Sequence, residues 1–321
     1  LMDQAALNLQ RLNGLARRCE ERQVASEVFV PRIFPLLFPP ERVAGQEAAL
    51  DEAAAAFPAS RDERPVSFLH ALALRQRIAG GRVAPLFGRV ARVPPPWLAA
   101  LALLPSVLAA GWIGLARGSR DPGRSLPLAA MHAVVVTGGC GMAWSLLILF
   151  SYQTRAGALY GRIGMLAALF MLGLAAGGAA LARSADLPAG SPRRRLLLVG
   201  AAALLFALLM PAALRALDHP ALGRAALPEI LHGALLLLAG AITGSLFPVA
   251  AGVLLAGRRG VRETASGLEA ADHVGAAVAA LLGGVVFIPA LGLLGPARLL
   301  AARQAVALAG VLAAATTRSR E

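Results

Sequence analysis

The residues of this 321-residue chain that could do chemistry are a few ionisable side chains inside long apolar blocks. Glu229 and His232 are three residues apart in one block, so a helix would place them on one face. Glu269, Asp272 and His273 stand at i, i+3 and i+4 in the next block and would share a face in the same way. Because ionisable groups are costly at membrane depth, these five residues form our candidate intramembrane polar site.

Two interpretations of this candidate site remain open. In the first, the five residues line a polar cavity that handles a cation or a proton. In the second, each lies at a helix end in the membrane interface, where a charge costs little, and an anion in the first turn of a helix is favoured by the helix dipole. We favour the second, because Glu269 and Asp272 closely follow the arginine-rich segment 258–262.

Motifs for other kinds of chemistry are absent from the sequence. It contains no Walker loop, no Gly-x-Gly-x-x-Gly after a strand, no Gly-x-Ser-x-Gly and no Cys/His spacing typical of a metal site. Cys19 and Cys140 lie in different halves of the chain and are interpreted as small apolar fillers. We therefore expect no catalytic, cofactor-binding or metal-binding residues in this chain.

The composition indicates a membrane protein. Hydrophobic residues make up 57% of the chain and charged residues only 15%, against about 25% in soluble domains. Every basic residue is Arg, and from Trp97 onward the Arg residues separate apolar blocks rather than forming one basic patch. This pattern excludes nucleic acid as an expected partner and makes the lipid bilayer the expected one.

The expected fold is mostly α-helical, a polytopic bundle of about seven membrane spans preceded by other material. A bilayer span needs about 20 apolar residues, and most of the blocks reach that length. The spans are predicted near 97–116, 127–150, 156–182, 196–217, 227–255, 266–291 and 297–315. The last is the shortest and contains Arg303. Glycines at four-residue spacing, Gly173 with Gly177 and Gly240 with Gly244, predict close helix packing.

The N-terminal part differs in character, and we divide the chain into residues 1–83, a linker over 84–96 and a transmembrane domain over 97–321. Residues 1–83 are interpreted as soluble α/β material. Its expected elements are a helix over 3–21, a strand over 24–30, a proline-broken loop over 31–40, a helix over 40–56 and a helix over 71–78. Because the chain opens inside a charged helical pattern, we expect a further N-terminal part to precede it.

Three stretches, in their order along the chain, resemble the membrane-fused spermidine synthase-like (polyamine aminopropyltransferase-like) proteins. Arg61–His70, with the sequence RDERPVSFLH, is similar to the stretch that closes their synthase domain. Ser151–Tyr160 is similar to one of their membrane segments. Gly244–Val249, followed by 269–275 and 283–292, is similar to another. The resemblance spans most of the chain.

The resemblance implies that residues 1–83 are the C-terminal part of a Rossmann-like, methyltransferase-type domain. In the family, that domain moves an aminopropyl group from decarboxylated S-adenosylmethionine to a diamine such as putrescine. Its nucleotide loop and catalytic aspartates precede the matched segment, so this chain alone is expected to be inactive. The alternative is a transporter-like membrane module for polyamines or other small cations, without catalysis.

The resemblance also bears on orientation. Polyamines and the nucleotide are cytoplasmic, so residues 1–96 are expected in the cytoplasm and the spans in a bacterial plasma membrane. With seven spans, the positive-inside rule gives the opposite answer, because the loops on the other side carry ten Arg and those on the side of residues 1–96 carry six. We favour the substrate argument, since one miscounted span reverses the charge count.

Overall fold

A computed structural model describes residues 9–22, 60–61, 64–117, 125–156, 160–183, 191–219, 226–257 and 260–315. The chain divides into two compact units, Leu1–Ala59 and Ser60–Glu321. In the first unit, the described residues form α1 (Leu9–Glu21), as the periodicity of that segment predicts. The predicted strand over 24–30, the proline-broken loop and the helix over 40–56 lie outside the described residues.

Two short helices open the second unit. Helix α4 (Ser67–Ile78) begins four residues before the predicted start and ends two residues before Gly80, whose φ of +68° suits a residue without a Cβ. Helix α5 (Ala84–Arg92) occupies much of the segment that we treat as a linker. Val66 and Leu69 are buried in a small core with Ala91, Leu98 and Ala290. This core fixes the α4–α5 hairpin to the helices that follow.

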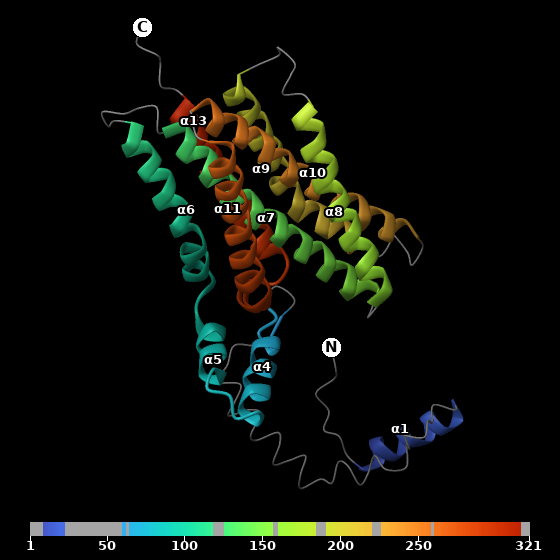
Figure 1. The fold of residues 1–321 in the computed structure, drawn as a ribbon. Coiled ribbons are helices and arrows are strands. Elements are labelled where there is room, and N and C mark those ends of the chain that lie inside the picture. Colours follow the sequence, from blue (N-terminus) through green and yellow to red (C-terminus); the bar gives the residue numbers. More distant parts are fainter. Residues whose placement is uncertain are drawn as a thin grey trace. The chain divides into compact units, whose positions relative to one another are not determined.

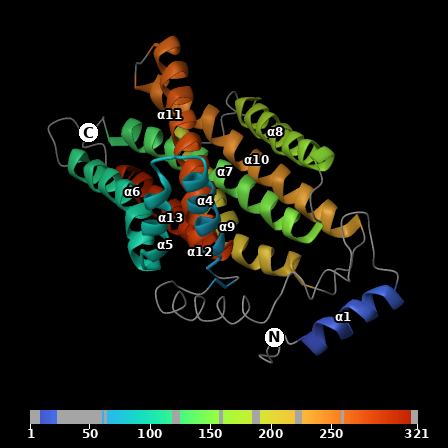
Figure 2. The same ribbon diagram turned by 90° about the horizontal axis from the view of Figure 1, so that it is seen from below.

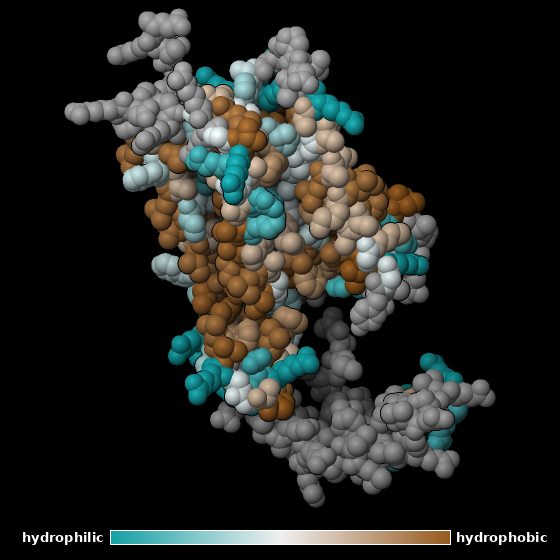
Figure 3. All heavy atoms as spheres, in the orientation of Figure 1, coloured by the Kyte–Doolittle hydropathy of each residue, from teal (hydrophilic) through white to brown (hydrophobic). Residues whose placement is uncertain are grey.

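Seven helices in the described part of the chain are long and apolar enough to cross a membrane, which confirms the predicted number (Figure 1). They are built on α6 (Pro95–Arg117), α7 (Ser125–Ala156), α8 (Tyr160–Arg183), α9 (Pro192–Leu217), α10 (Ala226–Ala256), α11 (Val261–Leu282) and α13 (Leu294–Ala315). Hydrophobic side chains cover most of the visible face of this bundle (Figure 3). The helices therefore indicate a membrane protein, whose apolar outer surface suits lipid.

Helix α7 is the centre of the bundle. Most of its apolar stretch, 72%, is buried inside the protein, against 17% for α6. It packs against α6, α9, α10, α11 and α13. Figure 2 shows α10 lying between α8 and α7. The second span is therefore a core helix, whereas α6 and α8 lie at the edge of the bundle.

The glycines predicted to pack helices do so between α8 and α10. A Cβ placed on Gly173 would overlap the backbone carbonyl of Leu237, and one on Gly177 would overlap that of Ala241. The contact is mutual, because a Cβ on Gly240 would overlap the carbonyl of Phe170. The two backbones touch directly, as small-residue motifs allow in lipid.

The sixth span departs from a simple helix in two ways. It begins at Val261, five residues before the predicted start near Ser266. It then changes to a π-helical turn, η5 (Gly283–Phe287), and to α12 (Ile288–Leu291), which ends at Gly292 with a φ of +67°. Pro289 explains part of this, because proline removes one helical hydrogen bond and its ring disfavours the regular helix.

The described residues contain helices and one isolated bridge, between Arg61 and Arg64, but no strand. The predicted all-helical membrane part is therefore confirmed. A Rossmann-like remnant over residues 1–83 stays a prediction, since most of the segment that would carry its strand lies outside the described residues.

Candidate functional site

The five predicted residues lie in two separate places. Glu229 and His232 lie near the start of α10, and Glu269, Asp272 and His273 lie in the first half of α11. Within the described part of the chain, no hydrogen bond or ion pair joins the two sets. Each set therefore lies on one helix, as the spacing predicts, but the fold does not unite the two sets in one cavity.

His232 is fully buried and held on both ring nitrogens. Its Nδ1 lies 2.6 Å from the carbonyl oxygen of Pro228, one turn earlier. A carbonyl only accepts, so Nδ1 carries the proton and Nε2 is the acceptor. The Ser151 hydroxyl of α7, 3.3 Å away, therefore donates to Nε2. Tyr152 adds an edge-on ring contact, with ring centroids 5.3 Å apart.

This serine–histidine pair has the hydrogen bond that links a nucleophile to its base, but a substrate could not reach it. Ser151 is 7% exposed and His232 0% exposed. No carboxylate contacts the imidazole, because Nδ1 is occupied by the Pro228 carbonyl. The pair is a polar link between α7 and α10, where a satisfied hydrogen bond replaces two unpaired polar groups in an apolar core.

Glu229 belongs to a different group at the surface of the same helix end. Its Oε2 accepts from Nη1 of Arg162 at 3.0 Å, and the same nitrogen lies 3.4 Å from the hydroxyl of Tyr152. The side chain of Arg162 is 53% exposed and that of Glu229 26%. Such a partly exposed pair contributes little to stability, about 0–1 kcal/mol. It joins α8 to α10 at the end of the close glycine contact.

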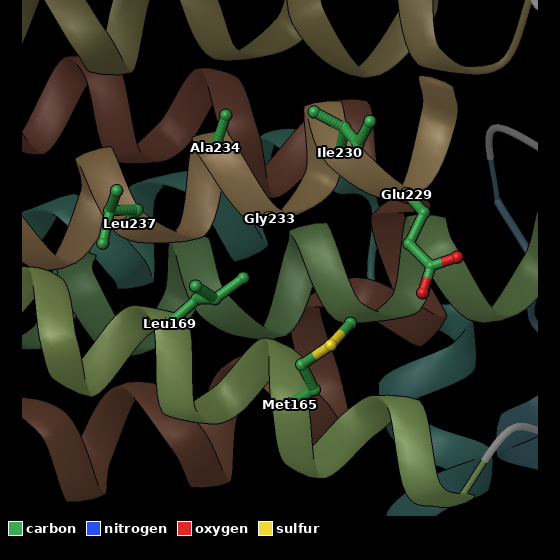
Figure 4. A pocket seen from close by; sticks show the side chains of 7 residues that line it. All are labelled: Met165, Leu169, Glu229, Ile230, Gly233, Ala234 and Leu237. Atoms are coloured by element: carbon green, nitrogen blue, oxygen red, sulfur yellow. The ribbon is translucent and has the colours of Figure 1, made fainter. Parts of the chain in front are cut away.

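A shallow groove leads away from Glu229 between α8 and α10 (Figure 4). Met165 and Leu169 of α8 form one side, and Ile230, Gly233, Ala234 and Leu237 of α10 form the other. Apart from Glu229, its lining is apolar. Because the groove lies on membrane-spanning helices and is almost wholly apolar, it suits a lipid chain better than a polar ligand.

The three residues on α11 point largely outward. Glu269 is exposed, and the side chain of His273 is 74% exposed. Asp272 is 37% exposed, with its Oδ2 3.8 Å from Nδ1 of His273. Its carboxylate lies over Gly138 of α7, where a Cβ would overlap it. Because α11 begins at Val261, Asp272 is its twelfth residue and lies beyond the first turn, where the helix dipole favours an anion.

We expect the substitution Asp272→Asn to change the free energy of unfolding by less than about 1 kcal/mol. Asparagine keeps the shape over Gly138, and the lost ion pair is long and partly exposed. The measurement is unfolding of the purified protein by sodium dodecyl sulfate in mixed micelles. Gly138→Val is the contrasting variant, because it places carbon where the carboxylate lies; a large loss with Asp272→Asn itself would show that the charge is structural.

A second polar group lies deeper in the bundle and is missing from the predicted site. Nε2 of Gln304 donates to Oγ1 of Thr137 at 3.3 Å, and both residues are almost fully buried. Nε of Arg303 donates to Oγ of Ser106 at 3.4 Å. His132 lies within electrostatic reach of Arg303. In the sequence, Arg303 stands out only as a charge within the last predicted span, and that alone does not indicate a site.

We compared the chain with known proteins. No protein family, curated protein or solved structure matches it. In the described residues, no three His, Cys, Asp or Glu side chains come together as metal ligands. Among the described residues, the fold brings together the Ser151–His232 pair, the surface pair Arg162–Glu229 and the group around Arg303.

Proposed function

We propose that this chain is the integral-membrane C-terminal part of a spermidine synthase-like aminopropyltransferase. In this proposal, the bundle anchors a polyamine-synthesis domain on the cytoplasmic side of a bacterial plasma membrane. The catalytic half of that domain would precede this chain, and decarboxylated S-adenosylmethionine would be its substrate. The observation that supports an anchoring role best is the attachment of the Arg61–His70 stretch to the first span.

Arg64, in the middle of that stretch, makes the attachment. Its Nη2 donates to the carbonyl of Ala91 at 2.8 Å and to that of Val93 at 3.1 Å. These carbonyls lie at the C-terminal end of α5, where helical carbonyls lack partners and a cation is favoured by the dipole. Val66, two residues on, is 1% exposed in the core shared with Leu98 of α6. The stretch is thus fixed to the base of the first span.

Such attachment suits an anchor. The Arg-Pro-Val-Ser segment would close a soluble domain, and its own side chains would join that domain to α5 and α6 with little free linker. A freely jointed tether needs no buried contact of this kind. The catalytic chemistry itself rests on the sequence resemblance.

The alternative, a carrier of polyamines or other small cations, has one observation in its favour: the accessible carboxylates of Glu269 and Asp272 on α11. Against it stands Arg303, a half-buried positive charge near the middle of α13. A polyamine crossing there would meet repulsion. We therefore place the anchor first.

The test of the proposed function measures aminopropyl transfer in isolated membranes. Cells express either this chain or the same chain extended by the coding sequence upstream of Leu1, and membranes receive decarboxylated S-adenosylmethionine and putrescine. We expect spermidine and methylthioadenosine only from the extended protein, in the membrane fraction. No product from the extended protein, or product from this chain alone, would contradict the assignment.

The anchoring contact has its own test. We expect Arg64→Met to increase cleavage of the α4–α5 hairpin by proteinase K about tenfold or more. Each hydrogen bond from a charged donor contributes about 1.5–3 kcal/mol, and 1.4 kcal/mol is a factor of ten in the opening equilibrium. Arg75→Met, at an exposed position of α4, is the matched control. Equal cleavage of the two variants would show that Arg64 does not hold the hairpin.

A further inference from the structure

Arg303 occupies a position where an arginine is costly. It is the tenth residue of the 22-residue α13, so it lies about 13 Å along a helix of about 33 Å. Arginines at the ends of spans extend to the interface, but one so near the middle is far from either end. Arg303 is half-buried, and its Nε contacts Ser106 of the neighbouring helix α6.

The described residues supply no acidic partner for that charge. Arg303 makes one hydrogen bond among them, from Nε to the hydroxyl of Ser106 at 3.4 Å. No Asp or Glu oxygen of this part of the chain lies within ion-pair distance of it. A neutral hydroxyl leaves the positive charge uncompensated, which is the costly state for a charge away from water.

The unused donors of Arg303 form a fork. Because Nε is taken by Ser106, the two terminal nitrogens have no partner among the described residues. Neither belongs to the side-chain nitrogens that are sealed from solvent without a hydrogen bond. They can therefore be reached, and paired N–H groups of a guanidinium match the two oxygens of a carboxylate.

His132 brings a further unsatisfied donor to the same region. Both of its ring nitrogens are buried and without a hydrogen-bond partner, and a neutral imidazole always carries one N–H. The charge of Arg303 acts on it electrostatically. The nearby Gln304 and Thr137 side chains hydrogen-bond to each other and do not compensate the positive charge of Arg303. The uncompensated groups here are thus a cation with reachable donors and an imidazole whose ring nitrogens are closed to solvent.

We infer that Arg303 binds the carboxylate of a small organic acid between α6, α7 and α13. The two terminal nitrogens of Arg303 hold the two carboxylate oxygens, while Ser106 fixes the guanidinium through Nε. The bound anion neutralises the half-buried charge, so it stabilises the bundle as well as occupying it. This site is independent of the proposed anchoring function.

Formate is the probe that tests this inference. Melting curves of the purified chain in detergent are recorded at a series of formate concentrations. Gluconate, which is too bulky for this position, keeps the ionic strength constant. Ligand that binds only the folded state raises its stability as the logarithm of ligand concentration over Kd. We expect the melting temperature, followed by tryptophan fluorescence, to rise with formate, and the dependence to give a dissociation constant.

Arg303→Gln removes the charge and Arg298→Gln is the control, because Arg298 is an exposed arginine in the first turn of the same helix. We expect Arg298→Gln to keep the formate response and Arg303→Gln to lose it. If Arg303→Gln fails to fold, Ser106→Ala replaces it, with an expected weakening of formate binding of several-fold. An unchanged response in these variants, no response in the wild type, or an equal response to chloride would overturn the carboxylate site.

Discussion

Gly177→Leu is expected to abolish the native α8–α10 contact and to lower the free energy of unfolding by about 3 kcal/mol or more. Any Cβ at this position overlaps the backbone carbonyl of Ala241, which cannot move aside as a side-chain end can. Overpacking of a well-packed site costs about 1–3 kcal/mol, and here the two helices must also separate along their whole contact. The measurement is the yield of folded protein and its unfolding by sodium dodecyl sulfate.

Gly164→Leu is the matched control on the same helix. A Cβ at Gly164 meets nothing within 4 Å, so the same chemical change adds only exposed apolar surface. We expect this variant to unfold like the wild type or to be slightly more stable, because leucine favours the helix over glycine. Similar losses in the two variants would mean that glycine acts through helix propensity and not through close packing.

Trp144→Ala is the second change with a large expected effect, a loss of about 3–5 kcal/mol. The Trp144 ring is fully buried in α7 and meets Phe206 of α9 edge-on, with centroids 4.9 Å apart. Truncation leaves a cavity at the centre of the bundle, between helices that cannot close around it. The free energy of unfolding in mixed micelles measures the loss.

Trp144→Phe separates the ring from its polar group. The indole Nε1 is buried without a hydrogen-bond partner among the described residues, so phenylalanine sacrifices no hydrogen bond. We expect it to cost less than half as much as alanine, because most of the packed ring remains. A loss as large as that of alanine would reveal a partner for the indole N–H.

The sequence was sufficient to predict the membrane part because each span is a local property. An apolar block of about 20 residues becomes a helix wherever it lies, and the glycines at 173, 177, 240 and 244 contact their partner helix because four-residue spacing places them on one face. The predicted start of the sixth span was five residues too late, because the prediction followed the apolar block alone. Arg262 and Glu263 end the apolar block, but nothing in the backbone prevents them from joining the first helical turn.

The sites depend on contacts between distant segments, and these were not predictable from spacing. Ser151 contacts His232 across 81 residues, and Gln304 contacts Thr137 across 167. The spacing predicts Glu229 and His232 on one helical face, but Glu229 lies at the surface and His232 lies in the core. Arg303 appeared only as an interruption of an apolar block, because its meaning depends on which helices surround α13.

The central place of α7 has a consequence for the synthesis of the protein. Among the described spans this helix is made second, while the Gln304 side chain that satisfies Thr137 is made 167 residues later. At about 5–20 residues per second, the ribosome needs roughly ten to thirty seconds to reach it. Ser151 of α7 meets His232 across only 81 residues, so α7 and α10 can pack while the Thr137 hydroxyl still lacks its partner. The core around α7 is therefore complete only once α13 has been made.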